Sequence, residues 1–99
     1  MEIITKKDGS SLTITLKGRM DAVTAEDLGK VIQSELSDVN ELIFDLKDLA
    51  YTSSAGLRQF LVAQKLMDGQ GSMAIRNVNE MVMDIFEETG FSNIFNIEK

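Results

Sequence analysis

The stretch Leu46-Lys47-Asp48-Leu49-Ala50-Tyr51-Thr52-Ser53-Ser54-Ala55-Gly56-Leu57 decides the fold, because a strand ends at its start and a helix begins within it. Residues 41–46 alternate in side-chain type with the period of two that is typical of a strand. Beyond them, apolar residues recur at helical spacing: Leu57, Phe60, Leu61 and Leu66. Ser53 and Ser54 therefore fall at a helix N-terminus, where free backbone N–H groups favour a capping serine or a phosphoserine.

The N-terminal residues predict a hairpin of two strands. Residues 2–7 and 11–17 alternate with strand periodicity. The dipeptide Asp8-Gly9 between them accepts the positive φ angles of a tight hairpin turn. Gly18 is expected to end the second strand.

Capping signals predict the limits of the helices. Thr24-Ala25-Glu26-Asp27 has the form of a capping box, so a first helix is expected from Thr24 to about Leu36. The helix that follows Ser54 should stop at Asp68-Gly69. A third helix should begin after the N-cap Asn79 and stop at Gly90.

Together these elements predict a single α/β domain over residues 1–99. Residues 73–77 are expected to form a further strand, and residues 91–97 a short last strand or a packed tail. The expected order is ββαβαβα, in a mixed, mostly parallel sheet of four to five strands with three or more helices. Strand-helix-strand alternation demands parallel pairing with right-handed crossovers.

Composition excludes several classes of function. The chain has no histidine and no cysteine, so zinc sites built on those ligands and Ser-His-Asp or Cys-His catalysis are excluded, and we expect no metal and no cofactor. A net charge of −6, without basic clusters, argues against nucleic acid as a partner. No apolar run approaches the roughly 18 residues of a membrane span, so no direct membrane contact is expected. The charged, alternating start of the chain does not resemble a secretion signal, and a cytoplasmic location is expected.

Two chemical alternatives for the serine and glycine motifs are weak. A serine nucleophile at position 54 would need glycine at position 52 to form the G-x-S-x-G elbow, but Thr52 stands there. Gly69-Gln70-Gly71 follows a helix and lacks the fuller glycine fingerprint of a phosphate cradle. We therefore expect no catalytic residues and no enzyme activity.

Three segments carry a resemblance to a known family over the whole chain. They are residues 16–22 after the second strand, residues 44–57 into the second helix, and Glu87-Glu88-Thr89-Gly90-Phe91 at the end of the third helix. With them the chain resembles the anti-sigma factor antagonist branch of the STAS domain family. The middle segment is the specific one.

The resemblance implies a phosphorylation switch. In that family the serine two residues before the turn glycine, here Ser54, is phosphorylated by an anti-sigma factor that is itself a serine kinase. A metal-dependent serine phosphatase reverses the modification, and the unmodified protein captures the anti-sigma factor. Well-known members have Asp before the acceptor, whereas this chain has Ser53, which is a second candidate acceptor.

The resemblance also implies a partner-binding surface around the acceptor. Its predicted members are Asp21, Thr52, Ser53, Ser54, Ala55, Gly56, Leu57 and Arg58. Asp21 either frames this surface or accepts hydrogen bonds from loop amides. Gly56 either admits a partner backbone or relieves crowding against the sheet. A non-switching STAS module that scaffolds an assembly or senses a small ligand is the alternative function.

Overall fold

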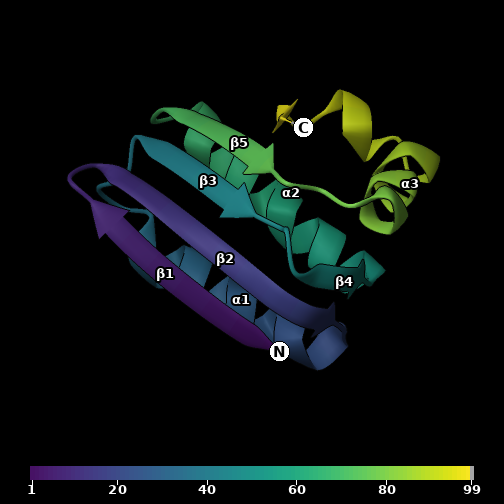
Figure 1. Cartoon of the computed structure of the whole chain (residues 1–99). Helices are drawn as coiled ribbons and strands as arrows, with labels where there is room; N and C mark the ends of the chain where they lie inside the picture. The colour runs from purple at the N-terminus through teal and green to yellow at the C-terminus, as the bar shows by residue number, and fades with distance from the viewer. Residues whose placement is uncertain (99) are drawn as a thin grey trace.

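A six-stranded sheet carries three helices in the computed structural model, which describes residues 1–98 (Figure 1). The elements in chain order are β1 (Glu2–Asp8), β2 (Ser11–Met20), α1 (Ala22–Glu35), β3 (Glu41–Asp45), β4 (Leu49–Thr52), α2 (Ser54–Asp68), β5 (Ser72–Arg76), α3 (Glu80–Glu88), the 3₁₀ turn η1 (Phe91–Asn93) and β6 (Ile97–Glu98).

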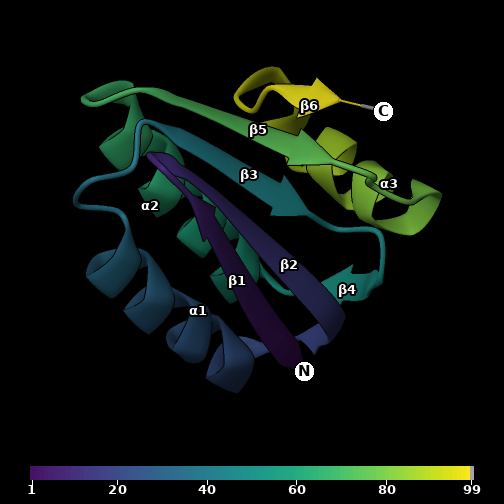
Figure 2. The same ribbon diagram turned by 60° about the vertical axis from the view of Figure 1, so that its left-hand side comes forward.

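The strands run in the order β1-β2-β3-β5-β6, and β4 pairs with the C-terminal end of β2 (Figure 2). Only β1 and β2 are antiparallel; the other pairs are parallel. This confirms the predicted α/β class and the mixed, mostly parallel sheet. The structure has six strands instead of the predicted four to five, because β4 is an additional short strand between β3 and α2. The last strand, β6, begins at the end of the residues expected to form a short strand or a packed tail.

Gly18 does not end the second strand, contrary to the prediction. With a φ of 104° it forms an irregularity at which the β2–β4 register shifts, and β2 continues to Met20. A glycine tolerates this left-handed backbone, so the strand bends without stopping. The extension carries β2 past β3 and gives β4 its partner.

The first helix begins two residues earlier than predicted, at Ala22 instead of Thr24. Its N-cap is Asp21, whose carboxylate accepts hydrogen bonds from the backbone N–H groups of Val23 at 3.0 Å and Thr24 at 2.9 Å. Thr24 completes the capping box from the other side, since its hydroxyl oxygen accepts from the Asp21 N–H at 2.8 Å. Asp21 thus accepts backbone amides, as in one of the two roles considered for it, but these amides belong to the first turn of α1 and not to a loop.

The predicted limits of the other two helices are confirmed. Ser53 caps α2, which ends before Gly69. Asn79 caps α3 by accepting from the Val82 N–H at 2.9 Å, and its amide also donates to the Leu49 carbonyl of β4 at 2.7 Å. The cap of α3 thereby ties this helix to the strand that leads into the serine pair.

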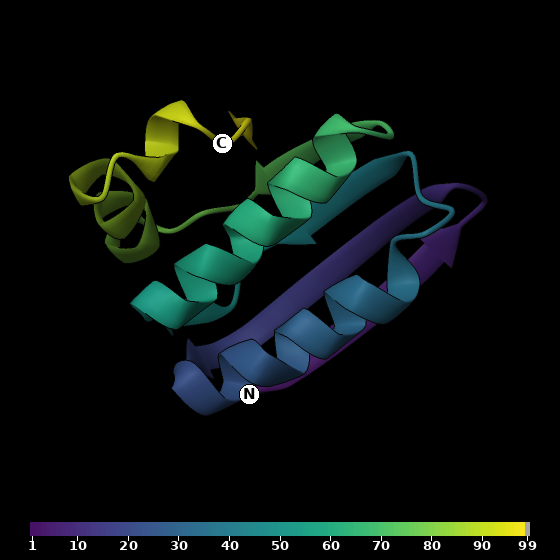
Figure 3. The same ribbon diagram turned by 180° about the vertical axis from the view of Figure 1, so that it is seen from behind.

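The core lies between the sheet and its helices. Helices α1 and α2 cross the same face of the sheet side by side (Figure 3). Phe60 of α2 makes edge-to-face contacts with Phe44 of β3, at a centroid distance of 5.0 Å, and with Phe86 of α3, at 6.0 Å. Such aromatic pairs lock three elements together, so the helix that begins at the serine pair has a fixed position.

Candidate functional site

Ser53 forms the joint between β4 and α2. Its Oγ accepts a hydrogen bond from the Gly56 N–H at 3.2 Å, and its own N–H donates to the Met20 carbonyl at 2.8 Å. The side chain is half-buried. Ser53, and not Ser54, is therefore the residue that caps the helix.

Ser54 is the first residue of α2 and is exposed. The Ser54 hydroxyl forms no hydrogen bond with another group in residues 1–98. It sits where the free N–H groups and the positive end of the helix dipole favour an added negative charge. The turn thus divides two tasks between its serines, because one closes the helix and the other presents a free hydroxyl.

Three members of the predicted partner surface have buried side chains or backbones. Thr52 is 2% exposed and Leu57 is 4% exposed, and Gly56 is also buried. A Cβ on Gly56 would lie 2.3 Å from the Thr52 hydroxyl and 2.7 Å from the Met20 sulfur. Of the two reasons considered for Gly56, the fold shows relief of crowding. The side chains of Thr52 and Leu57 are too buried to contact a docking partner directly.

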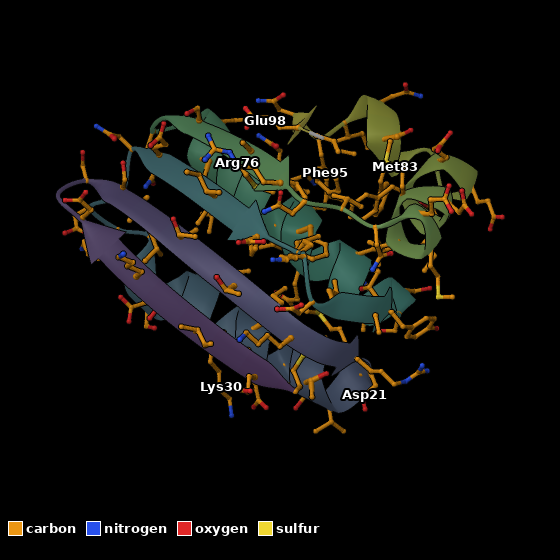
Figure 4. All side chains as sticks on the ribbon, viewed as in Figure 1. Asp21, Lys30, Arg76, Met83, Phe95 and Glu98 are labelled. Atoms are coloured by element: carbon orange, nitrogen blue, oxygen red, sulfur yellow. The ribbon has the colours of Figure 1, made fainter. Side chains whose placement is uncertain are left out.

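The accessible members lie on two adjacent helix starts. Asp21 and Arg58 are exposed, Ser53 and Ala55 are half-buried, and Ser54 is exposed. The β2–β4 pairing, which places Met20 opposite Thr52, brings the start of α1 beside the start of α2. Figure 4 shows Asp21 at this end of the sheet.

The Asp21 carboxylate is ionised more readily than an ordinary one. Hydrogen bonds from the Thr24 backbone and side chain, with a further one from the Val23 backbone, lower the pKa of Asp21. Arg58 is charged at neutral pH. The accessible members of the predicted surface thus include one acidic and one basic side chain, together with the uncharged, exposed Ser54 hydroxyl.

Three further residues lie at this edge and were not predicted from the sequence. The guanidinium of Arg19 lies 4.6 Å from the centre of the Tyr51 ring, a cation–π contact, and the two residues are register partners on β2 and β4. Val23, next to the cap of α1, is 71% exposed. Had β4 been recognised as a strand, its pairing with β2 would have placed Arg19 beside Tyr51.

The loop Gly69-Gln70-Gly71 is structural. The Gln70 side chain donates hydrogen bonds to the carbonyls of Leu36 and Val39. A Cβ on Gly71 would lie 2.0 Å from the Asn40 carbonyl oxygen. This loop is packed against the α1–β3 connection and leaves no cradle for a phosphate.

The described part of the chain lacks the features of two other classes of site. Residues 1–98 hold no group of three or more metal-ligating His, Cys, Asp or Glu side chains. None of the helices described is both long enough and apolar enough to span a bilayer.

Comparisons with known proteins agree on the family. The profile of the STAS domain matches residues 2–99. The chain is 32% identical over 97 residues to a Bordetella bronchiseptica protein named as an anti-sigma factor antagonist, BtrV, covering 96% of this chain and 84% of that one. It is 27% identical to the anti-sigma-B factor antagonist of Bacillus subtilis, covering 93% and 85%.

Solved structures share the fold. An anti-sigma factor antagonist from Mycobacterium paratuberculosis superimposes with a TM-score of 0.87 at 18% identity, over 97% of this chain and 83% of that chain. The anti-sigma factor antagonist SpoIIAA in its unphosphorylated form gives 0.75 at 14% identity, over 99% and 88%. With the matched profile and the relatives in sequence, these comparisons establish that the chain belongs to the STAS domain family, in its anti-sigma factor antagonist branch.

Proposed function

We propose that this domain is a phosphorylation-controlled binding module that captures an anti-sigma factor with serine kinase activity when Ser54 is unmodified. The observation that carries the proposal is the exposed Ser54 hydroxyl, without a side-chain hydrogen bond in residues 1–98, on the first turn of a helix fixed to the core. The relatives named as anti-sigma factor antagonists support the class of partner. SpoIIAA, which shares the fold, has been solved in both phosphorylated and unphosphorylated forms.

Phosphate at Ser54 should leave the fold intact. It adds about −1.5 to −2 charges at neutral pH. Near a helix N-terminus, a negative group is stabilised by about 0.3–1 kcal/mol. The modified domain is therefore expected to keep the packing of α2 on the sheet.

At a docked interface the same charge has the opposite effect. A dianion that loses its hydration against an unprepared partner surface costs several kcal/mol. Because 1.4 kcal/mol corresponds to a tenfold change in affinity, a penalty of this size releases the partner. The switch works by blocking a docking face and requires no refolding.

Ser54 is a better acceptor than Ser53 on structural grounds. Ser53 Oγ is occupied with the Gly56 N–H, and modification of Ser53 would disturb the cap of α2. Loss of such a cap costs about 0.5–2 kcal/mol. Ser54 carries no comparable duty within residues 1–98.

The proposal assigns all catalysis to the partners. The domain supplies a hydroxyl, the kinase transfers the phosphoryl group from ATP, and a metal-dependent serine phosphatase removes it. We place this cycle in the cytoplasm, where ATP is available. The domain itself acts as a substrate and a ligand.

The test uses a purified anti-sigma factor that has serine kinase activity. With ATP, it should modify the wild type and Ser53→Ala on the peptide that holds residue 54, and should leave Ser54→Ala unmodified. By calorimetry, unmodified protein should bind the kinase at least 100-fold more tightly than protein carrying phosphoserine at position 54. Equal affinities of the two forms would overturn the switch and favour a scaffold without phosphorylation control.

A further inference from the structure

We propose that a groove between α3 and β6 binds a basic, apolar segment of a protein partner. The groove has a volume of about 380 Å³. The residues that line this α3–β6 groove are Val78, Glu80, Met83, Asp84, Glu87 and Ile97. It shares no residue with the serine turn, so the proposal goes beyond the switch.

The floor of the groove is apolar. Val78, Met83 and Ile97 are each half-buried, packed against the core on one side and open to the groove on the other. Figure 4 shows Met83 on α3, on the same side of the molecule as the C-terminal strand. An apolar side chain inserted into the groove would be stabilised, because the exposed parts of these side chains and of the inserted group would leave water together.

The rim of the groove is acidic. Glu80, Asp84 and Glu87 are spaced at i, i+4 and i+7 along α3, which places them on one face of the helix. All three are exposed, and none forms a salt bridge with a cation in residues 1–98. Like charges at this spacing repel one another within a helix of nine residues, and a bound cationic segment would relieve that repulsion.

The opposite wall of the groove is β6, which is held in place by contacts within the domain. The Ile75 N–H donates to the Asn96 carbonyl at 2.8 Å, and the Arg76 guanidinium forms a 2.6 Å salt bridge with Glu98. These contacts attach β6 to β5 and fix the position of Ile97 between them. The groove is therefore preformed, and binding does not first have to order the C-terminal strand.

Charge and size select the occupant. The three rim carboxylates span about 10 Å along the helix axis at 1.5 Å per residue. A segment of about two helical turns, with Lys or Arg toward the rim and Leu or Phe toward the floor, matches both the length and the chemistry. A second copy of this chain is a poor match, because each copy carries a net charge of −6.

The test titrates ¹⁵N-labelled domain with a synthetic 14-residue amphipathic peptide made of Lys, Arg and Leu. Amide shifts should centre on residues 78–87 and 97. The variant Asp84→Asn/Glu87→Gln should weaken binding at least fivefold. The matched variant Glu26→Gln/Asp27→Asn removes the same charge from an exposed part of α1 and should bind within twofold of wild type.

Two further results decide the proposal. A peptide with Ser in place of Leu should bind at least fivefold more weakly, since it cannot use the apolar floor. Equal weakening by both double variants, or shifts spread over the whole surface, would show only a general attraction to an acidic domain and would overturn the proposal. Unchanged amide dispersion in each variant verifies that the fold is retained.

Discussion

Gly56 lies so close to Thr52 that a Cβ atom on the glycine would sit 2.3 Å from the threonine hydroxyl oxygen. The two residues belong to the first turn of α2 and the last position of β4. Their contact folds the strand end tightly against the helix start, with the serine pair between them. The position of the exposed Ser54 is therefore fixed by packing beneath it.

The variant Gly56→Ala tests this packing. Alanine favours a helix over glycine by about 1 kcal/mol, but its Cβ would also lie 2.7 Å from the Met20 sulfur. Overpacking of this kind costs about 1–3 kcal/mol, so we expect a net loss in the free energy of unfolding measured with urea. Gly69→Ala is the matched control, because the nearest atom to its Cβ would be 3.7 Å away, and an equally stable Gly56→Ala protein would contradict the argument.

Local patterns predicted much of the fold. Asn79 and Gly69 were recognised as helix limits because capping depends on residues within one turn. The strand β4 was missed because its four residues have no clear alternation and its partner, the end of β2, lies 31–32 residues earlier in the chain. Asp21 was missed as a cap because Thr24, its partner in the capping box, itself has the sequence signature of a cap.

The position of the serine pair in the fold was predicted from the sequence, but the burial of the residues around it was not. The motif placed Ser53 and Ser54 at the start of a helix, as the structure shows. Ser53 and Ser54 are adjacent, so which of them caps the helix depends on the single residue at which the helix begins. The role of Gly56 depends on Met20, which is 36 residues away in sequence and reaches it only through the β2–β4 pairing.

A pair of alanine variants separates the two serines. Ser53→Ala removes the cap and should reduce the free energy of unfolding by about 0.5–2 kcal/mol. Ser54→Ala removes an exposed hydroxyl and should change it by less than about 0.5 kcal/mol. Urea denaturation of both proteins measures the difference, and the reverse ranking would show that Ser54 is the cap.

Arg58 should stabilise the dianionic form of a phosphate on Ser54. The two residues are four positions apart on one helix, both exposed, so their side chains are neighbours on its surface. In protein prepared with phosphoserine at position 54, ³¹P NMR should give a second phosphate pKa below the usual value of about 6. Arg58→Gln should move that pKa upward; an identical titration in both proteins would show that the arginine does not reach the phosphate.

The Asp21 cap should make stability depend on pH on the acid side. Hydrogen bonds from Thr24 and Val23 lower the pKa of Asp21 in the folded protein, while in the unfolded chain it stays near 3.9. The unfolded chain therefore binds more protons in this range, so the stabilisation is complete above the unfolded pKa and is lost as pH falls through the lowered folded pKa. Asparagine also caps helices but does not titrate, so Asp21→Asn should flatten the decline in unfolding free energy below about pH 4.

A second carboxylate provides the control for this pH dependence. The ammonium of Lys7, 2.6 Å from Asp38, lowers the pKa of Asp38 through a hydrogen bond and its charge. Asp21 and Asp38 lie beyond opposite ends of α1, about 20 Å apart at 1.5 Å per residue, so their effects should add. Urea denaturation from pH 2.5 to pH 7 should show a smaller acid slope in each single variant and the smallest slope in Asp21→Asn/Asp38→Asn. A wild-type slope in Asp21→Asn would mean that folding does not lower the pKa of Asp21, and the hydrogen bonds to its carboxylate would then not be a source of pH-dependent stability.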